Sequence, residues 1–169
     1  MSGPAVRFTD EQVRRYSRQL LLVDVGGRGQ RRLLSAEVAV DVDGVAGRIA
    51  AVLLAAAGVG RVVLCGRLER LLGDEDGDAS VPLSPDDRGR TLGDAMTQQL
   101  AARNGDVAAV LARTAPASCL RVDAGDGTLA DAFARAGEAA TRVVHGIATG
   151  ADGPVLDGLG IVAGPGPAR

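Results

Sequence analysis

The chain has 169 residues and a net charge of −2 at pH 7, which is long enough for a sizeable core and gives no general attraction to nucleic acid or to an anionic membrane. All 19 of its basic residues are arginine, which excludes a mechanism that needs a lysine of this chain. One histidine and two isolated cysteines, Cys65 and Cys119, do not have the spacing of a zinc site. We expect both cysteines to be small buried residues.

The N-terminal 35 residues are expected to form a helical arm. Residues 9–12 (Thr-Asp-Glu-Gln) are a capping box that predicts a helix over about residues 10–22. Arg15 and Arg18 lie on that helix, away from its apolar face. The two glycines at 26 and 27 break the helix, and a short second helix should follow.

A glycine-containing turn then joins a strand near 36–42 to a helix near 46–57. This layout is typical of a nucleotide-binding strand–turn–helix, whose pattern is G-x-G-x-x-G. Here the pattern reads Val42-Asp43-Gly44-Val45-Ala46-Gly47, so the first glycine is a valine.

Strands and helices continue to alternate after this turn. We expect strands near 61–65, 107–111, 119–122 and 142–145, and helices near 92–103 and 129–136. The alternation predicts a Rossmann-like, mostly parallel sheet with helices on both faces over residues 36–149. His145 would end the last strand as a rim residue, because no catalytic partner can be assigned to it. Residues 150–169 are rich in glycine and proline and are expected to form a tail.

Four short segments within residues 9–107 together resemble a known superfamily. They are residues 15–20, 26–30, 55–61 and 99–104. In that order they are similar to the R-Y-x-R-Q-[IL], G-x-x-G-Q, A-x-A-G-V-G and L-x-x-[LI]-N patterns of the ThiF/MoeB-type adenylating domain, which is related to the ubiquitin-activating enzymes. The chain therefore resembles a truncated and degenerate member of that superfamily.

The resemblance implies ATP binding and adenylation of the C-terminal glycine of a ubiquitin-like protein, but several ATP-holding positions differ. The replacements are Val42 and Val45 for loop glycines, Gly66 for the ribose-binding acid, Leu92 for the lysine and Ala148 for the magnesium-binding aspartate. In the family, the arginine of the arm reaches across a dimer interface toward the ATP of the partner subunit. Arg15 and Arg18 are therefore candidates for action at a partner's site.

The residues of the turn also argue against phosphate binding. A phosphate cradle needs free backbone N–H groups and the positive end of a helix facing the anion. Asp41 and Asp43 place like charge there, and the Cβ atoms of Val42 and Val45 hinder close approach of a ligand to the backbone. We expect Asp43 to cap the following helix in place of a phosphate.

Three functional readings follow. The first is a catalytically degenerate ThiF-like protein that acts as a non-catalytic partner or scaffold for a complete adenylating enzyme, as a homo- or heterodimer, or for a ubiquitin-like carrier. It implies no cofactor, no metal and no catalytic residue of its own. The second is an active ATP-dependent adenylyltransferase that uses ATP and magnesium. The third is a Rossmann-like binding module with another ligand at the carboxyl edge of its sheet. No signal peptide or membrane span is recognisable, so a cytoplasmic location is expected.

Overall fold

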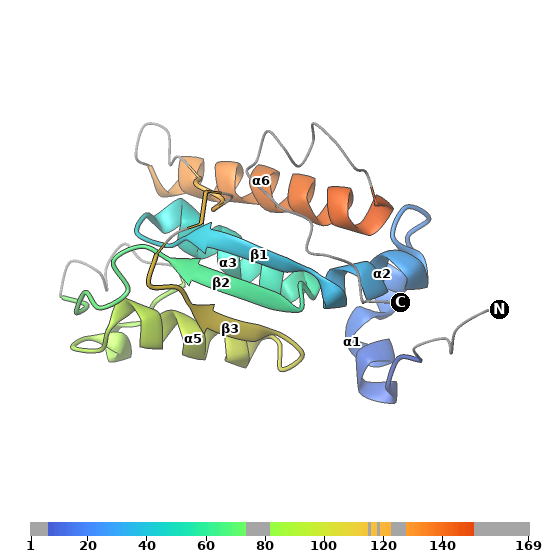
Figure 1. Ribbon diagram of the computed structural model, residues 1–169, viewed down its shortest axis with the longest axis horizontal. Helices are drawn as coiled ribbons and strands as arrows, with labels where there is room; N and C mark the ends of the chain where they lie inside the picture. The colour runs from blue at the N-terminus through green and yellow to red at the C-terminus, as the bar shows by residue number, and fades with distance from the viewer. Residues whose placement is uncertain (1–6, 74–81, 115, 118, 123–127, 151–169) are drawn as a thin grey trace.

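The computed structural model describes residues 7–73, 82–114, 116–117, 119–122 and 128–150 (Figure 1). Its elements are α1 (Asp10–Leu20), α2 (Gly26–Ser35), β1 (Glu37–Asp41), α3 (Val45–Ala57), β2 (Arg61–Cys65), the 3-10 helix η1 (Pro85–Asp87), α5 (Leu92–Arg103), β3 (Ala108–Leu111) and α6 (Leu129–Thr149). The Rossmann-like α/β fold predicted from the sequence is confirmed.

The three strands form a parallel sheet in the order β1-β2-β3. A single parallel bridge joins Val40 of β1 to Leu120, so the chain returns to the opposite side of β1 after completing β3. The strand expected near 119–122 is therefore only one bridge long among the described residues. Because the strands are parallel, the turns that follow β1, β2 and β3 all lie at one edge of the sheet, its carboxyl edge.

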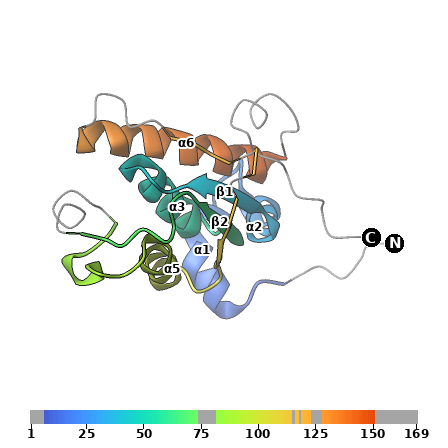
Figure 2. The same ribbon diagram turned by 60° about the vertical axis from the view of Figure 1, so that its left-hand side comes forward.

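Helix α3 lies in the middle of the molecule, packed against the sheet and between α5 and α6 (Figures 1 and 2). Its residues are small on most sides, and eight of its thirteen residues are buried. The side chains that point from β1 and β2 into this core are Val38, Val40, Val62 and Leu64, all at most 1% exposed. The small alanines of α3 let the sheet, α5 and α6 pack closely against this helix, so the core is well filled without a tryptophan.

Helix boundaries follow local chemistry. Thr9 accepts a hydrogen bond from the backbone N–H of Gln12, and the Gln12 side chain accepts one from the N–H of Thr9, so the predicted capping box of α1 is confirmed. Gly58 ends α3 with φ +87°, in the left-handed region that disfavours side chains. A Cβ there would also lie within 3 Å of Tyr16 and Gln30.

Helix α6 corrects two predictions. We expected a helix near 129–136 and a strand at 142–145, but one helix of 21 residues covers both segments. Its buried residues Ala132, Ala136, Ala140 and Val143 recur every three or four positions and face α3. The β-branched pair at 143–144 favoured a strand locally, whereas packing on α3 favours the helix. The tail predicted after residue 150 lies outside the described residues.

None of the helices in the described part of the chain is long and apolar enough to cross a membrane.

Candidate functional site

The glycine turn after β1 leads directly into α3. Gly44 is the N-cap of α3, and no side chain there accepts a hydrogen bond from the first turn of the helix. A Cβ at Gly47 would lie 1.8 Å from the carbonyl oxygen of Asp41, so this glycine is required for close helix–strand packing. A Cβ at Gly44 would meet nothing within 4 Å. Of the two retained glycines, only Gly47 has a steric reason to be one.

Asp43 does not cap α3, so that expectation is wrong. Its Oδ1 instead accepts a hydrogen bond of 2.7 Å from the backbone N–H of Arg67, and its Oδ2 lies 3.3 Å from Nε of Arg67. The backbone N–H of Asp43 donates to Oδ1 of Asp41 at 3.0 Å. Asp43 therefore links the turn after β1 to the turn after β2. Its hydrogen-bond donor, Arg67, lies 24 residues later in the chain, so the local sequence around Asp43 does not predict this contact.

Gly66 lies beneath this link. Its φ is +115°, and a Cβ there would be 2.8 Å from Oδ1 of Asp43 and 3.2 Å from Oδ1 of Asp41. The acid that the resembled family carries at this position would meet two carboxylates already in place. Asp43 and an acid at position 66 are therefore alternatives in this backbone.

The two valines of the turn have packing roles. Val42 is fully buried in the main core, so its side chain points inward and not toward a ligand. Val45 is half-buried and packs on a second apolar cluster formed by α3 and α6. Beside them, Nε of Arg121 lies 3.6 Å from Oδ2 of Asp41 and forms an ion pair next to the parallel bridge between Val40 and Leu120. Each of the two acids of the turn thus has an arginine partner.

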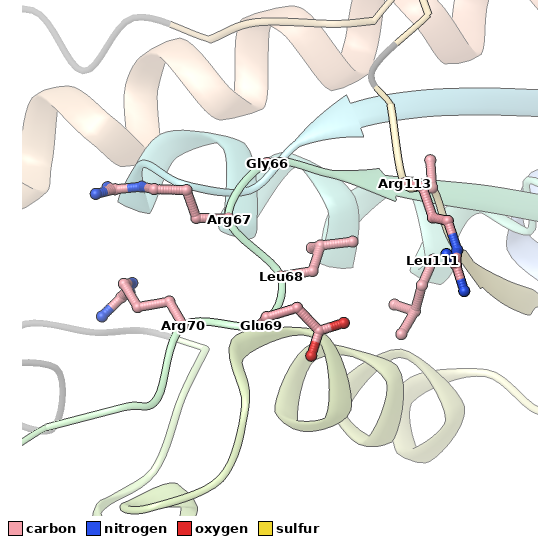
Figure 3. A pocket seen from close by; sticks show the side chains of 8 residues that line it. Gly66, Arg67, Leu68, Glu69, Arg70, Leu111 and Arg113 are labelled. Carbon is pink, nitrogen blue, oxygen red and sulfur yellow. The ribbon is translucent and has the colours of Figure 1, made fainter.

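A cleft of about 830 Å³ opens beside the turn, at the carboxyl ends of β2 and β3. Figure 3 shows Arg67 and Arg70 on one side, Arg113 and Leu111 on the other, and Leu68 and Glu69 between them. The remaining lining residues are Gly66 and Ala112. Glu69 is the only acid among the described lining residues, and Arg67 is already paired with Asp43. Arg113 therefore supplies the positive charge of the cleft that has no partner among the described residues. These arginines were not predicted as a group, because only the sheet brings them together.

Two further positions matched to ATP-holding residues are buried. Leu92 begins α5 and is 0% exposed, and Ala148 is 2% exposed within α6. Neither position faces the cleft. His145 is exposed on α6 and does not end a strand, so its expected place was wrong. In the part of the chain that the structure describes, no three His, Cys, Asp or Glu side chains converge as they would around a metal ion.

The two arginines of the arm, Arg15 and Arg18, have different contacts in the structure. Nη1 of Arg15 lies 2.5 Å from Oδ2 of Asp106, and Nη2 lies 2.6 Å from Glu11. The hydrogen bond to Asp106 is the main cause that raises the pKa of Arg15. Arg18 is exposed and has no hydrogen-bond or ion-pair partner among the described residues. Helix α1, which carries both arginines, lies at the amino ends of the strands, opposite the turns that follow β2 and β3 and line the cleft (Figure 1).

A polar network fixes the arm to this edge. Nδ2 of Asn104 donates to the hydroxyl of Tyr16 at 2.9 Å and to the carbonyl of Ala55 at 2.8 Å. The Tyr16 hydroxyl donates to Oδ2 of Asp106 at 3.1 Å. Tyr16 is 1% exposed and Asn104 is 2% exposed, and burial raises the pKa of Tyr16. The motifs containing Tyr16 and Asn104 were recognised in the sequence, but their contact, 88 residues apart, was not.

The two cysteines are free and buried, as predicted. Burial, together with a hydrogen bond between the two thiols, raises the pKa of Cys119 to about 12. Burial also raises the pKa of Cys65. Both thiols are therefore protonated at neutral pH, and neither is an activated nucleophile.

Comparison with known proteins supports the resemblance over part of the chain. HesA (heterocyst) of Trichormus variabilis is 46% identical over 59 residues, which are 35% of this chain and 22% of HesA. The adenylyltransferase and sulfurtransferase MOCS3 of Bos taurus is 49% identical over 61 residues, which are 36% of this chain and 13% of that protein. The matched stretch thus spans less than a quarter of either relative. No model of a protein family matches the chain.

Solved structures extend the similarity of fold. The crystal structure of PaaA superposes with a TM-score of 0.72 at 19% identity, covering 90% of this chain and 70% of PaaA. TcdA (CsdL) superposes with a TM-score of 0.55 at 19% identity, covering 63% of this chain and 40% of TcdA. At these identities the similarity concerns the fold alone.

Proposed function

We propose that the chain, which is similar to ThiF/MoeB-type adenylyltransferases over part of its length, is a catalytically degenerate member of their superfamily that acts through a protein partner. The partner would be a complete adenylating homologue or a ubiquitin-like carrier protein. Its own function would be to support or hold that partner, without an adenylation step of its own.

The link formed by Asp43 carries this proposal. It occupies the space between the turn after β1 and the turn after β2, through contacts of 2.7 and 3.3 Å with Arg67. The ribose-binding acid has no room at Gly66 while Asp43 is there. A nucleotide would have to displace an anchored carboxylate and would meet its charge.

The buried positions support the same reading. Leu92, at the position matched to the lysine, is enclosed in the core, and no lysine of the chain can replace it. Ala148, at the position matched to the magnesium-binding aspartate, lies in a helix packed on α2 and α3. Restoring either function would require more than one substitution.

Arg18 is the residue through which we expect the chain to act. Its exposed guanidinium has no partner among the described residues and carries a fork of donors suited to phosphate or carboxylate. Since α1 lies at the amino edge of the sheet, far from the carboxyl edge of its own chain, we expect this guanidinium to act on another molecule. Arg15, in contrast, holds the arm in place through Asp106.

Nucleotide binding is tested by isothermal calorimetry with ATP and magnesium. We expect no heat of binding up to millimolar ATP, while a complete ThiF-type enzyme titrated in parallel binds. Saturable binding to this chain would instead favour the second reading, an active adenylyltransferase. One observation does favour that alternative: the first turn of α3 has no side-chain cap, so its N–H groups are not occupied by a side chain.

Partner action is tested with a complete ThiF-type homologue from the same organism. We expect a complex at micromolar concentration, and a change in the partner's adenylation rate of at least about tenfold on Arg18→Ala. Arg14→Ala is the matched control, because Arg14 is exposed on the same helix and, within the described part of the chain, bonds only to the Asp10 carbonyl of its own helix. Arg15→Ala should lower the melting temperature. Absence of a complex would contradict the proposal, as would equal adenylation rates of the partner with the Arg18→Ala and Arg14→Ala variants.

A further inference from the structure

We infer that the cleft at the carboxyl ends of β2 and β3 binds a small organic oxyanion, with its carboxylate or phosphate group on Arg113 and its apolar part on Leu68 and Leu111. This site is separate from the proposed action of the arm. It also differs in place from a phosphate site at the start of α3, because Arg113 follows β3 and not β1.

The charged side chains that line the cleft support an anionic ligand. Arg113 is exposed and has no hydrogen-bond or ion-pair partner among the described residues, so all five of its N–H donors are available. Arg67 gives its Nε to Asp43 and is otherwise exposed. Glu69 is the one acid among the described residues that line the cleft. The guanidinium of Arg113 therefore favours an anion, and its fork of donors matches the geometry of a carboxylate or phosphate.

The fixed walls are the second argument. On one wall, the backbone N–H groups of Leu92 and Gly93 donate to the carbonyls of Arg70 and Leu68, at 2.8 and 2.9 Å. On the other wall, the N–H of Ala112 donates to the carbonyl of Leu64 at 2.9 Å, one residue before Arg113. Backbone held on both sides lowers the entropy lost when a ligand binds.

The apolar surface is the third argument. Leu111 is 45% exposed and lies beside Arg113, while Leu68 is 8% exposed and faces the gap (Figure 3). An inorganic ion would leave this surface in water. A ligand with a hydrocarbon part next to its anionic group would cover this surface and bind more tightly in proportion to the apolar area removed from water.

The test is an NMR titration of ¹⁵N-labelled protein with inorganic phosphate, citrate, acetate and butyrate, each at the same ionic strength as a sodium chloride control. We expect saturable shifts of the Leu68, Ala112 and Arg113 signals, with dissociation constants of about 0.1–10 mM. Butyrate should bind more tightly than acetate, which has the same charge and less hydrocarbon.

Substitutions separate this site from general attraction to arginine. Arg113→Gln should weaken binding at least about fivefold, and Glu69→Gln should strengthen it about two- to threefold by removing a like charge at the edge of the bound anion. Arg103→Gln is the matched control, because Arg103 is exposed at the end of α5 near the amino edge and should leave the affinity unchanged. The inference is overturned if the shifts equal those of sodium chloride, or if Arg113→Gln and Arg103→Gln behave alike.

Discussion

Replacing Gly66 with aspartate places a carboxyl group where the resembled family has an acid. Gly66 has φ +115°, and its Cβ would lie 2.8 Å from Oδ1 of Asp43. That oxygen is anchored by the backbone N–H of Arg67. The new side chain therefore meets an unfavourable backbone angle and a fixed carboxylate together.

Two terms set the size of the effect on the free energy of unfolding. A side chain in a sparsely populated backbone region costs about 1–3 kcal/mol. Two carboxylates about 4 Å apart repel by about 1 kcal/mol in water and about 4 kcal/mol near a protein surface. Together these terms lead us to expect that Gly66→Asp lowers the free energy of unfolding by about 2–7 kcal/mol. Gly89→Asp is the control for the first term alone, because Gly89 has φ +76° and nothing within 4 Å of its Cβ position.

The assay is a double-mutant cycle by urea denaturation with Gly66→Asp and Asp43→Gly. Asp43→Gly alone should be destabilising, since it removes the bond to Arg67. In the double variant the new carboxylate takes the space that Asp43 left, so the two losses should be less than additive by at least about 1 kcal/mol. Additivity within about 0.5 kcal/mol would refute the reasoning that the two acids compete for one place.

Three further outcomes are expected. Gly47→Ala should lower the free energy of unfolding by more than about 3 kcal/mol, because its Cβ would lie 1.8 Å from a carbonyl oxygen. Gly44→Ala should lower it by less than about 1 kcal/mol, because nothing lies within 4 Å of that Cβ position. Equal melting temperatures for the two variants would contradict the role of Gly47 in packing. Asn104→Ala leaves the Ala55 carbonyl without its side-chain donor and should lower the free energy of unfolding, measured by urea denaturation, by about 1–3 kcal/mol. The affinity of the distant cleft for an anion should not change. The pKa of Cys119 is raised from the ordinary 9.0 to about 12. Its contribution to the free energy of unfolding should therefore be constant below pH 9 and fall as the pH rises above 9, because the thiol of the unfolded chain loses its proton first. A free energy of unfolding that stays constant up to about pH 11 would contradict this.

Local sequence predicted the elements that local chemistry determines. β2 and α5 have the predicted bounds because glycines flank the strand and a threonine cap opens the helix. The glycine that ends α3 was predicted for the same reason. The carboxyl half of α6 was missed, because its valines favour a strand and only the contact with α3 decides otherwise.

The candidate site was predicted less fully than the fold. The identities of Asp43 and Gly66 were noticed separately, but not that one fills the place of the other. Arg15 and Arg18 were given the same role from the sequence, and their contacts with Glu11 and Asp106 distinguish them in the structure; Asp106 lies 91 residues away from Arg15. The carboxyl edge of the sheet was expected as a possible ligand site, but the residues of the cleft were not predicted, because its walls come from two turns, one after each of β2 and β3.

The docking of α1 decides how the role of the arm can be studied. Tyr16 is among the largest fully buried side chains, and it shares Asn104 with the carbonyl of Ala55 in α3. Deleting the arm would open a cavity at the amino edge and uncover polar groups there, so a truncated protein would lose function by unfolding, whatever the arm does. Only exchange of exposed side chains such as Arg18 leaves the scaffold intact and reports on recognition.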